Sequence, residues 1–152
     1  MKKIILITML MSAVFAQKDC NRNNWRVYYN SDGKDMSDCD LTDANLSGRT
    51  LEGANLTDAN LTGADLGRAT VEGANLTNAN LTGARLIRTN LRYANLTDAN
   101  LTRARLTDAY LTDATLEGVP LEGAHLTIAR FTGANLTDAH LTDAKLMLVH
   151  LT

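Results

Sequence analysis

A leucine recurs at every fifth residue from Leu41 to Leu151, and this spacing restricts the possible folds more than any other feature. Of these 23 positions 21 are Leu, with Val71 and Phe131 as substitutes and no insertion, so each five-residue unit must be folded alike. In a helix, at about 100° per residue, a step of five would scatter the leucines around the whole cylinder. In a straight strand they would alternate faces, because five is odd. The spacing therefore predicts short extended segments that turn a corner every five residues.

A second, longer period indicates how many corners make one turn. Residues 52–64 read EGANLTDANLTGA and residues 72–84 read EGANLTNANLTGA, so the two copies lie twenty residues apart and differ only at Asp58 and Asn78. Four corners per turn give a square β-solenoid whose coils stack at about 4.8 Å. Its core column is predicted to contain Leu56, Leu76, Leu96, Leu116 and Leu136, and the Ala two residues before most leucines lets the walls approach closely.

The unit A-[N/D]-L-x-x resembles the pentapeptide repeat, which runs without a break from Asp40 to Thr152. The resemblance implies an all-β fold, a right-handed quadrilateral β-helix. We expect residues 40–152 to form this solenoid and residues 17–39 to form an N-terminal cap. Because members of the family do unrelated things, the resemblance indicates the fold and says little about function.

Residues 1–16 are typical of a secretory signal. Lys2 and Lys3 precede an apolar run that extends to Phe15, and small residues lie at the −3 and −1 positions of a cleavage site before Gln17. An uncleaved anchor and a lipoprotein were the alternatives, but the run is short for a bilayer and the residues before Cys20 do not form a lipoprotein box. We therefore expect a periplasmic or extracellular protein with no membrane insertion after cleavage.

The segment before the repeats contains both cysteines and three aromatic residues. Trp25, Tyr28 and Tyr29 are placed to cover the open end of the leucine column. Cys39 lies in the inward, Ala phase, and an oxidising compartment favours a disulfide from it to Cys20, with two free thiols as the alternative. The stretch GKDMSDCDLTDANL also resembles the segment that leads into the repeats of exported pentapeptide proteins.

Two sides of the predicted solenoid present uncharged polar columns. Asn55, Asn75 and Asn95 lie on one of them, and Thr57 and Thr77 follow the same twenty-residue spacing. Such columns favour a structural role, with Asn and Thr hydrogen-bonded along the stack. The alternative is a regular Thr array that orders water, as in some ice-binding proteins.

The third side is basic, although the full chain has a formal net charge of −2. No acidic residue occurs between Glu72 and Asp98, and the predicted patch consists of Arg68, Arg85, Arg88 and Arg105. A patch of this kind fits an anionic protein or glycan, while the alternative is an ordinary solvated face beside Asp65 and Asp108. We expect no nucleic-acid partner, because no aromatic residue is interleaved with these arginines.

No pattern indicates catalysis. His125, His140 and His150 fall on three different sides and cannot converge on one metal, and a solenoid filled with leucine offers no cleft. We therefore expect a non-catalytic protein without a cofactor.

Three functions remain for such a chain. An exported interaction scaffold for a protein or glycan is favoured. The second is a DNA mimic that acts on gyrase, as the resemblance permits, although the signal and the partly basic surface argue against it. The third is the water-ordering surface.

The last coil becomes more apolar. Met147 and Leu148 occupy outward positions that are usually held by Thr and by Asp or Gly. We expect a homodimer through the C-terminal coil, with a monomer whose last coil frays as the alternative.

Overall fold

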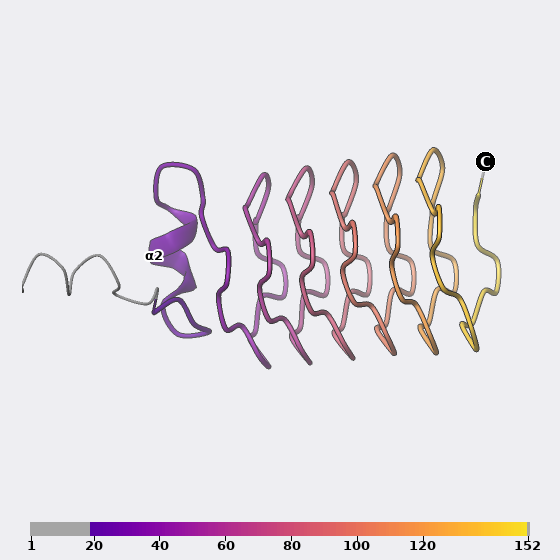
Figure 1. Cartoon of the computed structure of the whole chain (residues 1–152), viewed down its shortest axis with the longest axis horizontal. Coiled ribbons are helices and arrows are strands. Elements are labelled where there is room, and N and C mark those ends of the chain that lie inside the picture. Colours follow the sequence, from indigo (N-terminus) through magenta and orange to yellow (C-terminus); the bar gives the residue numbers. More distant parts are fainter. Residues whose placement is uncertain (1–18, 152) are drawn as a thin grey trace, which may run out of the picture.

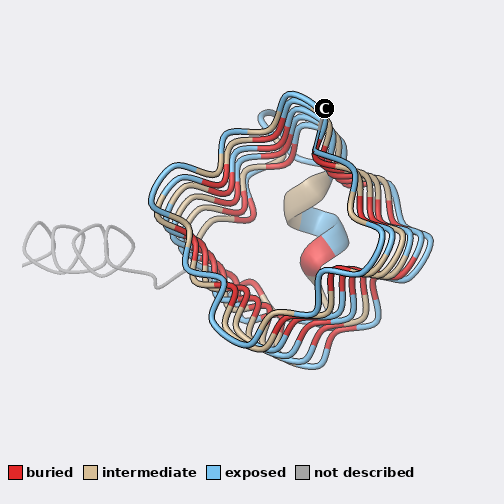
Figure 2. Ribbon diagram, turned by 90° about the vertical axis from the view of Figure 1, so that its right-hand side faces the viewer, coloured by how far each residue is buried: buried red, intermediate tan, exposed pale blue. Residues whose placement is uncertain are grey.

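The computed structural model describes residues 19–151, so the signal assigned to residues 1–16 lies outside the described residues. The chain winds into a β-solenoid whose coils stack along one axis (Figure 1). Helix α2, Trp25–Tyr29, lies at the N-terminal end of the stack, and the last coil lies at the other end. Viewed along the axis, the coils superimpose as a square with its buried residues on the inner wall (Figure 2). The predicted quadrilateral β-helix is confirmed.

Each side of a coil pairs with the same side of the next coil through a single parallel bridge. Asn55 bridges Asn75, and Asn75 bridges Asn95, so the register is twenty residues as the sequence period predicts. The described part of the chain contains these isolated bridges and no longer strand. One bridge of the series is missing where Pro120 would pair with Asn100, because proline has no N–H to donate.

The corners are tight turns between an inner residue, usually Leu, and the residue three positions later, usually Ala. At the first, the N–H of Ala44 donates to the carbonyl oxygen of Leu41 at 3.0 Å, and Asp43 has a φ of 53°. A positive φ at the third residue is the geometry of a type II turn, which favours Gly and Asn and tolerates Asp. This explains why most units have Gly, Asp or Asn two residues after the leucine.

The interior is a continuous column of leucine and alanine. Leu56, Leu76, Leu96 and Leu116 are each at most 1% exposed, as predicted. The prediction needs correction for Leu136, the fifth leucine of the column, because this residue is only partly buried. Among the described residues no complete coil stacks beyond Leu136, so one side of this leucine is uncovered.

The N-terminal opening of the column is closed by a cap. Trp25 is 5% exposed, and Tyr28 and Tyr29 pack partly buried against the core. Cys39 is fully buried in the first coil and forms a disulfide with Cys20. The repeat period did not predict α2, because this segment lies before the first leucine of the series.

Between residues 19 and 151, no helix combines the length and the apolar character needed to cross a bilayer.

Candidate functional site: a basic groove on the third side

The third side places its basic residues in one stacked column. Arg85 bridges Asp65 on the preceding coil and Arg105 on the next coil, and His125 and Lys145 continue the column. Neighbouring residues of the column are therefore one coil apart, about 4.8 Å. Of the four arginines in the predicted patch, Arg85 and Arg105 belong to this column, and Arg68 and Arg88 lie at the corner that follows it.

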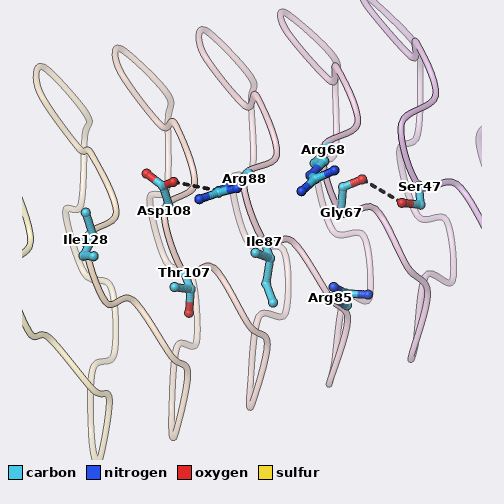
Figure 3. Close-up of a pocket in the computed structure, with 9 residues that line it drawn as sticks. All are labelled: Ser47, Gly67, Arg68, Arg85, Ile87, Arg88, Thr107, Asp108 and Ile128. Carbon is cyan, nitrogen blue, oxygen red and sulfur yellow. Dashed lines mark hydrogen bonds and ion pairs between the residues drawn. The ribbon is translucent and has the colours of Figure 1, made fainter.

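Beside this column the surface is hollowed into a groove of about 450 Å³ (Figure 3). We call it the third-side groove, and its lining residues are Ser47, Gly67, Arg68, Arg85, Ile87, Arg88, Thr107, Asp108 and Ile128. Three of the four predicted arginines line it. Arg105 lies outside this lining, one coil further along the column from Arg85.

Two of the groove arginines already have an acidic partner. Nη1 of Arg85 lies 3.2 Å from a carboxylate oxygen of Asp65, and Nε of Arg88 lies 3.0 Å from a carboxylate oxygen of Asp108. Asp108 also lies 3.8 Å from Nη2 of Arg130, which comes from the adjoining side. The side chains of Arg85 and Arg88 remain 52% and 57% exposed, so both guanidinium groups keep donors that face solvent.

Arg68 differs from these two arginines. Within residues 19–151 its guanidinium group has no ion pair, and its side chain lies on the coil next to that of Arg88 (Figure 3). The groove thus brings together three guanidinium groups and one lining carboxylate, that of Asp108. Its local charge is positive on a chain whose net charge is negative.

The corner that borders the groove carries side chains that its backbone disfavours. From residue 41 onward, six corner residues with positive φ are neither Gly, Asn nor Asp: Arg68, Arg88, Tyr93, Arg103, Ile128 and Leu148. Four of the six lie on this one corner, and Ile128 is β-branched with a φ of 62°. The left-handed conformation costs about 1–2 kcal/mol for such residues. Strain of this kind concentrates at functional sites, so it supports a use for the side chains at this corner.

Gly67 is an unusual residue in the lining of the groove. It follows Leu66, at the position where the coils on either side carry Ser47 and Ile87, and none of the other 22 residues in this position of the repeat is Gly. A Cβ on Gly67 would meet Oδ1 of Asp65 at 3.0 Å and the hydroxyl oxygen of Ser47 at 3.7 Å. A side chain at this position would therefore add atoms to the lining and press against Asp65.

Sequence reasoning identified the arginines and missed the groove. The signal for the groove was present in the unit LGRAT at residues 66–70, where Gly replaces the usual Thr and Arg replaces the usual Asp or Gly. The ion pair between Asp108 and Arg130 could not be predicted from the repeat, because the two residues lie on different coils and on either side of a corner.

The polar columns of the first side are hydrogen-bonded along the stack. The hydroxyl of Thr57 donates to Oδ1 of Asn55 at 2.7 Å and accepts from Nδ2 of Asn75 at 2.9 Å. The same pattern continues through Thr77, which donates to Asn75 and accepts from Asn95. Each of these two hydroxyl groups donates its only proton to an Asn of the same stacked column and has none left for water. This favours the structural role over water ordering.

A related contact perturbs one carboxyl group at the start of the repeats. The hydroxyl and the N–H of Thr42 both donate to Oδ1 of Asp40, at 2.7 and 3.2 Å, and they lower the pKa of that carboxyl below its usual value. The contact belongs to the turn and involves no second acid, so it does not mark a catalytic group.

The histidines lie apart from one another. The β-bridges of His125, His140 and His150 lie on three different sides of the solenoid. Nδ1 of His140 lies 3.7 Å from a carboxylate oxygen of Glu122. In the part of the chain that the structure describes, no group of three or more His, Cys, Asp or Glu residues is arranged to hold a metal ion.

The predicted dimer residues lie on the exposed last coil. Met147 and Leu148 are 64% and 69% exposed. The leucines of the inner phase are exposed here too, from Leu141 at 37% to Leu146 at 51% and Leu151 at 66%. The end of the stack away from α2 is therefore an apolar surface.

Comparison with known proteins identifies the repeat independently. A family model described as pentapeptide repeats matches residues 39–78, 79–118 and 116–152. A search of curated proteins found no match.

Solved structures of pentapeptide repeat proteins resemble the chain. One, from the thylakoid lumen of Arabidopsis thaliana, is 31% identical, with 65% of this chain and 69% of that chain covered and a TM-score of 0.64. Another, from the cyanobacterium Cyanothece, is 26% identical over 86% of this chain and 98% of that chain, with a TM-score of 0.58. The plasmid-mediated fluoroquinolone resistance protein QnrB1 shares the fold at 23% identity, covering 76% of this chain and 58% of that one, with a TM-score of 0.71.

Proposed function

The chain belongs to the pentapeptide repeat family, and on this premise we propose that it is an exported, non-catalytic scaffold that binds an anionic partner through its third side. The partner is a protein or a glycan outside the cytoplasm. The solenoid contributes rigidity, because each coil is held to both neighbours by backbone hydrogen bonds.

The arrangement of the interior supports a non-catalytic role. Leucine and alanine fill the inside of the stack, so chemistry would have to occur on an outer face. Many polar residues of those faces are engaged in stacked hydrogen bonds and ion pairs, such as Asn75 with Thr57 and Arg88 with Asp108.

Two observations support export. The disulfide between Cys20 and Cys39 joins the cap to the first coil, and disulfides persist in oxidising compartments. The similar structure from Arabidopsis belongs to a lumenal protein. Both agree with the signal expected from the sequence of residues 1–16.

The single observation that carries the proposal is the groove of the third side, which is lined by three exposed arginines. Arginine forms forked, charge-assisted hydrogen bonds with carboxylates and other anions, which suits it to this kind of recognition. The DNA-mimicking function would need an acidic surface, and a basic groove does not supply one.

The test compares two baits, the unmodified protein and a variant in which Arg85, Arg88 and Arg105 are all replaced by Ala. Each is immobilised and exposed to the envelope and extracellular fractions of the source organism. We expect partners that the unmodified bait retains at low salt and that the variant loses. Exposed ion pairs contribute about 0–1 kcal/mol each, so the variant should keep its melting temperature within a few degrees. Retention of the same partners by both baits would reject the third side as the binding surface.

A further inference from the structure

We propose that the third-side groove binds an extended acidic peptide segment, with a carboxylate held by Arg68 and Arg88 and a neighbouring aliphatic side chain packed on Ile87 and Ile128. The inference rests on the proposed function and names the partner's chemistry and the place where it binds.

The length of the groove fits an extended chain. Its lining runs from Ser47 to Ile128, with Gly67, Ile87 and Thr107 on the intervening coils. Four steps between five coils correspond to about 19 Å along the axis. A peptide in extended form rises about 3.3 Å per residue, so roughly six residues would span the groove.

The charges provide one open position for an anion. Arg85 and Arg88 are paired with Asp65 and Asp108, while Arg68 has no ion pair among the described residues. Arg68 and Arg88 follow one another on the same corner, about one coil spacing apart. A carboxylate between them would complete a row of alternating charges, with Asp108 at its far end.

The apolar part of the lining distinguishes a peptide from other anions. Ile87 and Ile128 lie on the groove wall, and Ile128 remains 37% exposed despite its strained backbone. Sugar hydroxyls placed against these isoleucines would lose hydrogen bonds to water without replacement, whereas a Leu or Val side chain would not. The groove also lacks an aromatic ring on which a nucleic-acid base could stack.

Gly67 lies next to this position. It precedes Arg68 in the lining and has no side chain, and its N–H donates to Oδ1 of Asp65 at 2.8 Å. A Thr at the equivalent position of another unit makes the same backbone hydrogen bond, since the N–H of Thr57 donates to Oδ1 of Asn55. Gly67→Thr therefore restores the usual repeat while it fills the groove and keeps every arginine.

The experiment uses the full rod after signal removal and a fluorescein-labelled, C-terminally amidated heptapeptide with a Leu-Glu-Leu core between Gly and Ser residues. Binding is followed by fluorescence anisotropy. Peptides with a Leu-Gln-Leu or a Ser-Glu-Ser core test the carboxylate and the aliphatic side chains separately. We expect only the Leu-Glu-Leu peptide to bind, with an affinity that falls as salt is raised from about 0.05 to 0.3 M.

The protein variants form a matched set. Arg68→Asn and Arg103→Asn each remove one guanidinium group from an exposed corner with positive φ, at 58° in both, and asparagine tolerates that conformation. We expect Arg68→Asn and Gly67→Thr each to weaken binding about tenfold or more, and Arg103→Asn to change it less than twofold. Thermal melting of each variant verifies that the rod is folded.

Several outcomes would overturn the inference. Equal binding of the Leu-Glu-Leu and Leu-Gln-Leu peptides would reject the carboxylate, and equal effects of Arg68→Asn and Arg103→Asn would reject the groove. Anionic phosphatidylglycerol vesicles and a uronic acid oligosaccharide serve as alternative probes. If either binds in an Arg68-dependent way and the peptide does not, the peptide is rejected while the anion-binding third side stands. If no anionic probe responds to loss of Arg85, Arg88 and Arg105, both the inference and the proposed function are wrong.

Discussion

Replacing one leucine in the middle of the stack should destabilise the whole solenoid. Leu96 is fully buried, with Leu76 on the coil before it and Leu116 on the coil after it, both at most 1% exposed. Its N–H donates to the carbonyl oxygen of Thr115 at 2.8 Å, so its backbone also joins two coils. Leu96→Ala removes buried methyl groups and leaves a cavity between closely packed walls, at a cost of about 2–5 kcal/mol.

A control in the same repeat phase separates burial from the substitution itself. Leu146 occupies the equivalent inner position on the last coil but is 51% exposed. Because about half of this side chain is already in contact with water, Leu146→Ala should lower the free energy of unfolding by only roughly 1 kcal/mol. Leu96→Lys should be far worse than either, because a buried unpaired charge costs several kcal/mol and domains of this size are stable by about 5–15 kcal/mol.

Urea denaturation followed by circular dichroism measures these differences as shifts of the midpoint. We expect a β-type spectrum with little helix, a large shift for Leu96→Ala, a small one for Leu146→Ala, and loss of the native transition for Leu96→Lys. Equal midpoints for the two Ala variants would refute the argument that coil-to-coil packing of the leucine column stabilises the fold. A Leu96→Lys protein with native melting would refute the solenoid itself.

Three further predictions concern the ends and the strained corner. Intact-mass analysis should show the Cys20–Cys39 disulfide, whose closed loop contributes about 3 kcal/mol in the chain-entropy model, and two alkylatable thiols in the unreduced native protein would contradict it. Ile128→Asn should raise the melting temperature by relieving the positive φ, by an amount equivalent to about 1 kcal/mol, and a lower melting temperature would show that Ile128 is not strained. Light scattering over a micromolar dilution series should give a dimer mass that falls to monomer in a Met147→Lys, Leu148→Asp variant, and a concentration-independent monomer mass for the unmutated chain would reject the end-to-end contact.

The leucine period determined the architecture because it excludes the alternatives on geometry alone. A five-residue step fits neither a helix nor a flat strand, and the twenty-residue echo fixes the number of corners, so the bridges between Asn55, Asn75 and Asn95 followed directly. The same reasoning placed Leu136 in the core and was wrong there. Complete burial requires a coil or a cap on both sides, and the period does not show where the stack is covered.

The candidate site was only partly predictable. Arg68 and Arg88 could be assigned to one corner by a step of twenty, and Arg85 to the adjacent column by its place three residues before Arg88, but the groove that Gly67 helps to line was not predicted. Which arginines are neutralised depends on side-chain reach across coils, as with Arg130 and Asp108, and the spacing of residues does not contain that information. The helix α2 was missed for a related reason, since its five residues carry no repeat.

The most direct measurement of the central claim is a nitrogen–proton correlation spectrum of the labelled rod, recorded while the Leu-Glu-Leu peptide is added. We expect the Nε–H signal of Arg68 and the backbone amides of Gly67, Ile87 and Thr107 to shift with one saturable curve, while the Nε–H signal of Arg103 stays in place. The same titration of Gly67→Thr should leave the remaining groove signals unshifted. Shifts spread evenly over the arginines of all sides, or confined to the exposed last coil, would contradict recognition by the third-side groove.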